Sequence, residues 1–453
     1  MKKTTLAPHF GRFGKSAGLA AILFTFYFGA VFAAGPADKP EAAPSFGQLL
    51  NSQPAGQPRD LNLRATDTDI SAADPLQGDD RYWATVRAAD KYERTRLLEA
   101  GLDIVEIKGG RVSGFARKAE LDLITENGFL VESRITIYEY AKKHLKDFPP
   151  ADAAYNNYKE TTDLLKTLAA NNPDVASLFS AGKTIEGREI WCLRLNATEK
   201  GEKPSSKPGA HYVGTHHARE HLSNEVALGL AVYLLEHKND AEIKKYLETL
   251  DIYIMPMLNA DGAEYDIQTG KYRWHRKNTR VNPDKSLGVD LNRNYDARWC
   301  QAGASHSPSA DTYCGPSAFS EPETLTVKKF VEARKNLKTL MSYHSYSSLL
   351  LYPWAGKATP LENERDLKVF TTMAKAMTGF TGYKPEQSSD LYVATGDTTD
   401  WAYMTAGIFA FTTELEGNSF YPGAAIITKA VAANVKAAVY LLSVTDDPYK
   451  LLR

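Results

Sequence analysis

The spacing of hydrophobic and polar residues divides most of the chain into two patterned regions. In the first, from 81 to 138, short apolar runs alternate with two amphipathic segments, and Gly109-Gly110 marks a hairpin turn. The predicted elements are strand 83–86, helix 91–100, strands 102–107 and 112–115, helix 118–126 and strand 129–135. The order β-α-β-β-α-β predicts a small ferredoxin-like α+β domain.

The second region runs from 154 to 453 and alternates strand-like runs with longer helical ones. The predicted strands are 190–195, 211–214, 252–257, 340–343 and 408–413. The predicted helices are 158–169, 224–237, 321–333 and 424–442. This alternation predicts one large α/β domain, with a mostly parallel central sheet and helices on both faces.

Two less regular segments precede and separate these regions. Residues 34–80 are rich in Pro, Ala, Gly and Asp, which is typical of a flexible linker. Residues 139–153 form a connecting segment that we expect to be exposed and sensitive to proteases. It carries three lysines followed by two prolines, Lys142, Lys143, Lys146, Pro149 and Pro150. The small domain therefore has two interpretations: a folding or packing accessory, or an inhibitory prosegment that an activating protease removes within 139–153.

The amino-terminal residues indicate export. Lysine or arginine at positions 2, 3, 12 and 15 precedes an apolar run, 17–32, and a cleavage site is offered at 31–33. This predicts a signal peptide over 1–33 and a secreted or periplasmic protein. An uncleaved membrane anchor is the alternative, because the run is long enough to span a bilayer.

Composition and charge exclude other classes of partner. The chain has 453 residues, of which 43% are hydrophobic and 24% charged, with a formal net charge of -1. This is ordinary globular composition. It offers no electrostatic footprint for nucleic acid or an anionic membrane surface.

The three cysteines divide into a pair and a single residue. Cys300 and Cys314 bracket a short loop rich in Gly, Ser and Ala. In an oxidising compartment they would form a disulfide worth about 3 kcal/mol at this loop length. Cys192 lies inside a predicted strand and is best explained as a buried thiol, because no partner histidine indicates a nucleophile.

Potential metal ligands follow the strand 211–214. His217 and Glu220 stand three residues apart in a polar turn before a long apolar helix, close enough to bind one cation. Catalytic zinc uses three protein ligands and keeps a fourth position for water. His344, at the end of another predicted strand, is the candidate third ligand, because functional groups gather at the carboxyl ends of parallel strands. The alternative, a hydrogen-bonded structural histidine, stays open on this evidence alone.

Two other histidines compete with His217. His216 is its neighbour on a predicted strand end, and because successive strand residues point to opposite faces, both cannot be ligands. His221 is interpreted as a helix-start residue. On this evidence His216 stays a rival of His217 for the first ligand position.

Further side chains have catalytic and binding chemistry. Glu414 ends an otherwise apolar strand, where desolvation would raise its pKa and suit it to act as a general base. Its alternative is a salt-bridged structural role. Arg276, Asn292 and Arg293 supply cationic and amide donors that suit a substrate carboxylate. Taken singly, each of these three is better explained by a surface pair or a turn than by a site.

Together these motifs, in this order and spacing from about residue 155 onward, resemble the zinc metallocarboxypeptidases of the pancreatic carboxypeptidase A/B family. The resemblance implies one Zn²⁺ per chain, bound by His217, Glu220 and His344. It implies that Glu414 is the general base for zinc-activated water and that Arg276 stabilises the oxyanion.

The resemblance also implies a set of substrate-binding residues. Asn292 and Arg293 would grip the substrate's C-terminal carboxylate and Arg219 would line an outer subsite. Tyr346 belongs to the third-ligand segment and Tyr392 matches the mobile tyrosine that closes over the substrate. Thr399 lies at the floor of the specificity pocket, where neither a strict hydrophobic nor a strict basic preference can be read from it, although Asp397 nearby would favour basic ends. The aromatic residue of the next subsite is Phe420 or Tyr421.

The expected function is removal of C-terminal residues from peptides and proteins. Two alternatives remain: a hydrolase of cell-wall peptides at γ-D-glutamyl-diaminopimelate bonds, and a catalytically dead binding protein. The small domain is shorter than the pancreatic prosegment but has a similar strand-helix order, which favours the prosegment interpretation and a zymogen.

Overall fold

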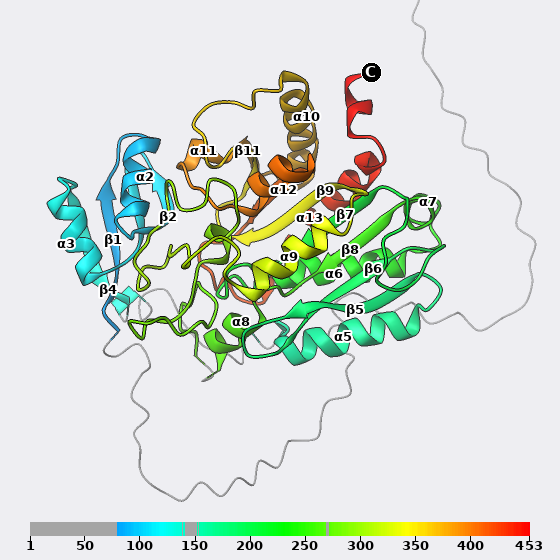
Figure 1. Ribbon diagram of the computed structural model, residues 1–453, viewed down its shortest axis with the longest axis horizontal. Coiled ribbons are helices and arrows are strands. Elements are labelled where there is room, and N and C mark those ends of the chain that lie inside the picture. Colours follow the sequence, from blue (N-terminus) through cyan, green and yellow to red (C-terminus); the bar gives the residue numbers. More distant parts are fainter. Residues whose placement is uncertain (1–78, 138, 141–151, 153, 269–270) are drawn as a thin grey trace, which may run out of the picture. The chain divides into compact units, whose positions relative to one another are not determined.

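A computed structural model describes residues 79–137, 139–140, 152, 154–268 and 271–453 (Figure 1). All of them belong to one compact unit, Gln53–Arg453. The predicted signal peptide, nearly all of the linker and most of the connecting segment lie outside the described residues. These three predictions therefore stay predictions.

The small domain has the predicted element order. It comprises β1 (Arg81–Arg87), α2 (Lys91–Glu99), β2 (Asp103–Lys108), β3 (Arg111–Arg117), α3 (Lys118–Glu126) and β4 (Val131–Thr136). Its sheet has the order β2-β3-β1-β4 with antiparallel neighbours, as in a ferredoxin-like fold. Asp90 caps α2 through the backbone N–H groups of Tyr92 and Glu93, and the apolar faces of both helices pack on the sheet.

The large domain is built on an eight-stranded sheet. Its strands are β5 (Ala176–Lys183), β6 (Glu189–Leu195), β7 (Gly209–Val213), β8 (Asp251–Met255), β9 (Leu337–Ser345), β10 (Leu349–Tyr352), β11 (Lys384–Gln387) and β12 (Phe409–Leu415). They lie in the order β11-β10-β12-β9-β7-β8-β6-β5. The central strands β12, β9, β7 and β8 are parallel, whereas β5, β6 and β8 pair antiparallel and β10 runs antiparallel to β12. The sheet is therefore mixed, and the predicted parallel character holds for its centre.

Helices cover both faces of this sheet, as predicted. They are α5 (Tyr158–Asn171), α6 (Leu222–Glu236), α7 (Ala241–Thr249), α8 (Ala260–Ile267), α9 (Pro322–Glu332), α10 (Glu364–Thr381), α11 (Ser388–Leu391), α12 (Thr398–Ala406) and α13 (Ala425–Thr445), with short 3-10 turns η2 (Leu291–Arg293) and η3 (Pro448–Leu452). Alternate residues of β7 reach opposite layers. The Tyr212 hydroxyl donates to Ala438 O of α13, whereas the ring of His211 packs on Phe330 of α9.

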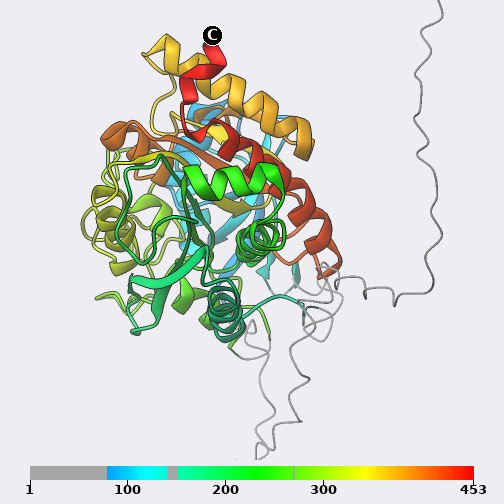
Figure 2. The same cartoon turned by 90° about the vertical axis from the view of Figure 1, so that its right-hand side faces the viewer.

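Two of the helices show how the second layer is assembled. In Figure 2, α10 (gold) and α13 (red) lie side by side, in agreement with their contacts. α13 is long and apolar enough to cross a membrane by length and composition, but half of its apolar window is buried inside the fold. Its apolarity is therefore accounted for by packing on α6 and α10.

The carboxyl ends of the central parallel strands bring the candidate site together. The turn after β7 carries His217 and Glu220, and β9 carries His344 as its next-to-last residue. β12 pairs with β9 in a register that sets Glu414 directly beside His344. Parallel strands end at the same edge of a sheet, which explains why residues almost two hundred positions apart meet here.

Candidate active site

The three predicted metal ligands converge on one point. His217 Nδ1 lies 2.7 Å from Glu220 Oε1, and His344 Nδ1 lies 3.1 Å from His217 Nδ1 and 3.0 Å from Glu220 Oε2. All three side chains are buried, and one potential ligand atom of each lies within 4.8 Å of the others. Two imidazole nitrogens and a carboxylate are the donor types of a catalytic zinc site.

The opposite ring nitrogens have partners that suit metal binding. His217 Nε2 lies 3.2 Å from Asp290 Oδ1, and His344 Nε2 lies 3.1 Å from Ser342 Oγ. When Nε2 donates to these oxygens, each Nδ1 keeps its lone pair for a cation. The residues present therefore fit a zinc ion.

Asp290 joins one ligand to the predicted oxyanion-binding group. Its Oδ2 accepts from Arg276 Nε at 3.0 Å, while its Oδ1 faces His217. Burial disfavours the charge, but Arg276 and then His217 outweigh it and hold the pKa of Asp290 well below its usual range. Burial likewise opposes the charge of Glu220, but His217 and His344 keep the pKa of Glu220 low. Both carboxylates are thus held as anions.

Glu414 has the opposite electrostatic setting. Burial, and after it the neighbouring Glu220 carboxylate, raises the pKa of Glu414 to about 8. A bound cation at the three ligands would act in the opposite direction. The structure thus places beside the ligands a carboxyl group whose raised pKa suits proton transfer near neutral pH.

A cavity of about 330 Å³ connects these groups with the predicted substrate-binding residues. It is lined from the large domain by His217, Glu220, Arg276, Asn292, Arg293, Tyr346, Tyr392, Glu414 and Phe420, among others. The small domain contributes Asp103, Ile104, Val105 and Ile107 of β2. The described residues that line the cavity do not include Thr399 or Arg219.

Asn292 and Arg293 are oriented by their own surroundings. Arg293 Nε donates to Gly303 O at 3.0 Å, and its Nη1 donates to Asn292 O at 2.8 Å. Asn292 N donates to Asp290 Oδ1 at 3.0 Å. The two side chains therefore reach the cavity from a short turn that these hydrogen bonds hold in place.

Two of the predicted substrate-binding residues, Arg219 and Thr399, do not line the cavity. Arg219 is fully buried, forms a salt bridge with Asp103 of the small domain, and its guanidinium lies 4.0 Å from the centre of the Phe420 ring. Thr399 is buried at the start of α12 and donates to Asp397 Oδ1 at 2.7 Å.

The rival histidines, His216 and His221, lie outside the three-ligand cluster among the described residues, and the reason expected for His216 is wrong. His216 and His217 point to different partners, but both lie in the turn beyond β7, so strand alternation is not the cause. His221 is the first capping residue of α6 and contacts Asp266 at 3.0 Å. Sequence reasoning assigned no role to Asp290 or Asp103; for Asp290 the available signal was an acidic residue two positions before Asn292, typical of a side chain that caps a turn.

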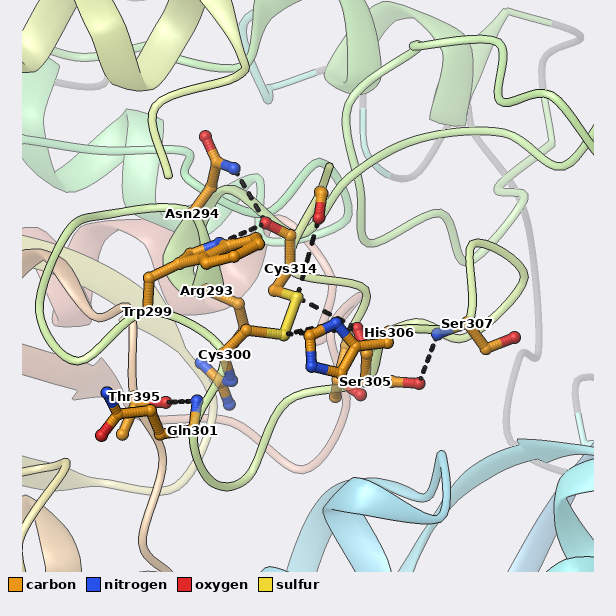
Figure 3. The surroundings of a disulfide bond; sticks show 12 residues. Arg293, Asn294, Trp299, Cys300, Gln301, Ser305, His306, Ser307, Cys314 and Thr395 are labelled. Carbon is orange, nitrogen blue, oxygen red and sulfur yellow. Dashed lines mark hydrogen bonds between the residues drawn. A yellow bond between two sulfur atoms is a disulfide. The ribbon is translucent and has the colours of Figure 1, made fainter. Parts of the chain in front are cut away.

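The predicted disulfide is present (Figure 3). Cys300 and Cys314 are bonded, with Cα atoms 5.9 Å apart, and His306 Nδ1 lies 3.5 Å from Cys300 Sγ. Because both sulfurs are in the disulfide bond, the cluster of Cys300, His306 and Cys314 is not a metal site. The closed loop supplies the Gly303 carbonyl that holds Arg293. Cys192 is buried and free, as predicted.

Comparison with known proteins identifies relatives by sequence. Residues 161–437 match the peptidase M14 family, zinc carboxypeptidase. The chain is 30% identical over 386 residues to a zinc carboxypeptidase of Saccharothrix mutabilis subsp. capreolus, covering 80% of this chain and 88% of the relative. It is 32% identical over 275 residues to carboxypeptidase B of Rattus norvegicus, covering 59% of this chain and 64% of that protein.

Solved structures agree on the fold. Carboxypeptidase A from Helicoverpa armigera superposes with a TM-score of 0.67 at 22% identity, covering 82% of this chain and 98% of that chain. Thrombin activatable fibrinolysis inhibitor superposes with a TM-score of 0.62 at 22% identity, covering 81% and 100%. The resemblance inferred from the motifs is confirmed: the chain belongs to the peptidase M14 family of zinc carboxypeptidases, hydrolases that act on C-terminal peptide bonds.

Proposed function

We propose that this chain is a zinc-dependent exopeptidase in which Glu414 is the general base and Asn292 and Arg293 recognise the substrate's free carboxylate. The observation that carries the proposal is a single cavity. It is lined by two of the three ligands, His217 and Glu220, by Glu414, which lies beside the third ligand His344, and by the two carboxylate-binding side chains.

The chemistry divides between the metal and the chain. His217, Glu220 and His344 would hold a zinc ion, which would supply Lewis-acid activation of water. Glu414 accepts a proton from the attacking water and later returns it to the departing amine. Arg276, aimed by Asp290, donates to the oxyanion that develops on the scissile carbonyl.

Recognition of the chain end makes the reaction an exopeptidase reaction. The Arg293 guanidinium and the Asn292 amide bind a carboxylate, so a peptide with an amidated end loses both contacts. Tyr392 would close over the bound residue. We infer that the preferred end residue depends on Thr399 and Asp397, whose hydroxyl and carboxylate are already paired with each other.

The small domain is proposed to be an inhibitory prosegment. Asp103 forms a salt bridge with Arg219 and lies 3.4 Å from Arg276 Nη1, so a carboxylate of the small domain occupies the donors proposed for substrate. The Tyr392 segment is also held: Arg94 Nη2 donates to Asp390 O at 2.9 Å, and Val393 N donates to Thr95 Oγ1 at 2.8 Å. An activating protease would cut within 139–153, and an exported location would suit the disulfide.

One experiment tests both proposals. Full-length protein, before and after limited proteolysis of the connecting segment, is incubated with N-blocked peptides ending in Phe, Leu, Lys, Arg or Glu and with the amidated forms. We expect chelator-sensitive release of one residue, stronger after cutting, from free ends only. Absence of release from all peptides, with zinc bound, would contradict the exopeptidase proposal. Release from γ-D-glutamyl cell-wall peptides alone would support that alternative instead, and zinc-free, inactive protein would support a binding role.

A further inference from the structure

His216 is a fully buried histidine for which the proposed mechanism has no use. Its ring lies nearly parallel to that of the ligand His344, with centroids 5.4 Å apart. Its Nδ1 lies 3.1 Å from Ser342 Oγ, and its Nε2 lies 3.0 Å from Thr398 Oγ1. Both ring nitrogens therefore have partners, on opposite sides of the ring.

These partners connect two parts of the site. Ser342 Oγ also lies 3.1 Å from His344 Nε2, and Thr398 Oγ1 lies 2.9 Å from Asn292 Oδ1. A continuous buried chain of hydrogen bonds therefore runs His344, Ser342, His216, Thr398, Asn292. We propose that His216 is a positioning residue, which couples the third metal ligand to the carboxylate-binding amide. This inference rests on the proposed function for the identity of the metal and of the carboxylate.

The direction of the chain is fixed at both ends. At one end, metal binding through His344 Nδ1 leaves the proton on Nε2, which must donate to Ser342 Oγ. At the other end, the backbone N–H of Thr398 donates to Asn292 Oδ1 at 3.0 Å. A backbone N–H can only donate, so this atom of Asn292 is the acceptor and the NH₂ group is left to face the cavity.

The middle of the chain must then run the same way. Because Ser342 accepts from His344, its own hydrogen is free to point to His216 Nδ1. Because Thr398 gives its hydrogen to Asn292, its lone pair takes the Nε2–H of His216. Only the Nε2–H tautomer of His216 satisfies both hydroxyls. Tyr295 OH lies 2.9 Å from His216 Nε2 and is compatible with this tautomer, although a hydroxyl that can donate or accept does not itself distinguish the two.

These hydrogen bonds couple two requirements of the enzyme, metal binding and recognition of the substrate carboxylate. A rotation of His344 that spoils metal binding would also disturb the amide orientation that admits a carboxylate, and the reverse holds. Groups that orient metal-binding histidines typically change metal affinity or activity by about 10- to 100-fold when replaced. We expect His216→Phe, which keeps a ring but removes both hydrogen-bonding nitrogens, to lower zinc affinity by roughly tenfold.

The test uses the full chain and four variants. Zinc affinity of apo protein is measured by competition with a chromophoric chelator for wild type, His216→Phe, His216→Gln, Ser342→Ala and His211→Phe. His211 is the matched control, because it is also fully buried but its ring nitrogens have no hydrogen-bond partner in the described structure. Weaker binding in His216→Phe and Ser342→Ala, partial rescue by His216→Gln, whose amide offers one acceptor and one donor, and unchanged binding in His211→Phe are expected.

A spectroscopic readout removes the dependence on stability. With ¹⁵N-labelled histidine, the zinc-loaded wild-type chain should show His216 as the Nε2–H tautomer, a signal identified by its loss in His216→Gln. In peptide hydrolysis, His216→Phe should raise KM about tenfold with a smaller change in kcat, because Asn292 acts in binding. The opposite tautomer, or zinc affinity unchanged in both His216→Phe and Ser342→Ala, would overturn the proposal. If wild type binds zinc but cleaves no peptide, the proposed function fails while the zinc and NMR comparisons still decide the role of His216.

Discussion

The charged groups of the large domain and of the small domain are neutralised in different ways around the same cavity. On the large-domain side, Asp290 contacts both Arg276 and His217, so these charges compensate one another within one domain. Arg219 is different, because its closest carboxylate, Asp103, comes from the small domain, whereas Asp311 of the large domain is farther away, with its Oδ2 3.8 Å from Nη1. Asp103 contacts both arginines, but Arg276 has its closer carboxylate, Asp290, within the large domain, whereas Arg219 has its closer carboxylate in the small domain.

This difference shows which charges are available for exchange. Arg219 has no exposed side-chain surface, and its Nε has no hydrogen-bond partner in the described structure. A buried guanidinium that loses its carboxylate needs another acceptor, since an unpaired buried charge is costly. Removal of the small domain would therefore leave Arg219 with only its longer contact to Asp311, whereas His217 would keep its partner Asp290.

The largest expected effect concerns the self-contained part. Glu414→Gln should lower kcat/KM about 10³-fold, because the amide cannot accept the proton from water. The loss should be equal in uncut and cut protein, since Glu414 acts through the large domain alone. Peptide hydrolysis and zinc content are measured together. A variant that retains zinc and more than a tenth of wild-type activity would show that another group is the base.

The second prediction also addresses internal compensation. Asp290→Asn should weaken zinc binding by about 10- to 100-fold, because His217 loses a charged partner and Arg276 loses its closer carboxylate. The matched control is Asp284→Asn, an exposed aspartate of the same loop region, which should bind zinc as wild type does. Chelator competition measures both. Equal affinities in the two variants would mean that Asp290 does not orient the ligand.

The third prediction separates the two domains. Asp103→Asn should raise the activity of the uncut chain roughly tenfold, which corresponds to about 1.4 kcal/mol of lost docking energy. After cutting, the variant and wild type should be equally active. Asp122→Asn, on the exposed face of α3, is the control and should behave as wild type. If Asp103→Asn leaves the uncut activity unchanged, this carboxylate does not block the site.

The sequence predicted the features of the two domains that depend on local pattern. Both domains, and the placement of His217, His344 and Glu414 at strand ends, follow from periodicity and from the shared edge of parallel strands. Three strands were missed: β5 and β11 at the two edges of the sheet, and β10 beside β11. β10 and β11 have only four residues each, and β5 has no clear alternation of apolar and polar residues. Their pairing, and hence the mixed sheet, is a tertiary outcome.

The hydrogen-bonded supports were beyond sequence reasoning for a different reason. His216 and Thr398 are 182 positions apart, and Arg219 and Asp103 are 116 apart and in different domains. No spacing rule connects such residues. Motifs predict which groups react, whereas the groups that orient them depend on how the complete fold packs.

The smallest expected effect is a pH dependence of small-domain docking. Glu120 of α3 lies near Asp311 of the large domain, with Arg117 and Lys277 as the nearby cations. Burial, reinforced by Asp311, raises the pKa of Glu120 to about 7. The docked state therefore binds a proton that the free domain releases above its ordinary pKa, near 4.5. Docking is favoured at low pH and weakens as pH rises from about 5 to about 7.5, by about 1 kcal/mol.

Dissociation of the small domain after the connecting segment is cut measures this effect directly. The rate of release should increase several-fold between pH 5.5 and 7.5 in wild type. It should be nearly constant in Glu120→Gln, which keeps an oxygen acceptor for the backbone N–H of Arg117. Lys277, whose pKa burial lowers to about 8, keeps most of its charge over this range. The same pH dependence in both proteins would place the titrating group elsewhere. A release rate that depends on pH in wild type but not in Glu120→Gln would show that the small domain contributes the titrating group to this interface.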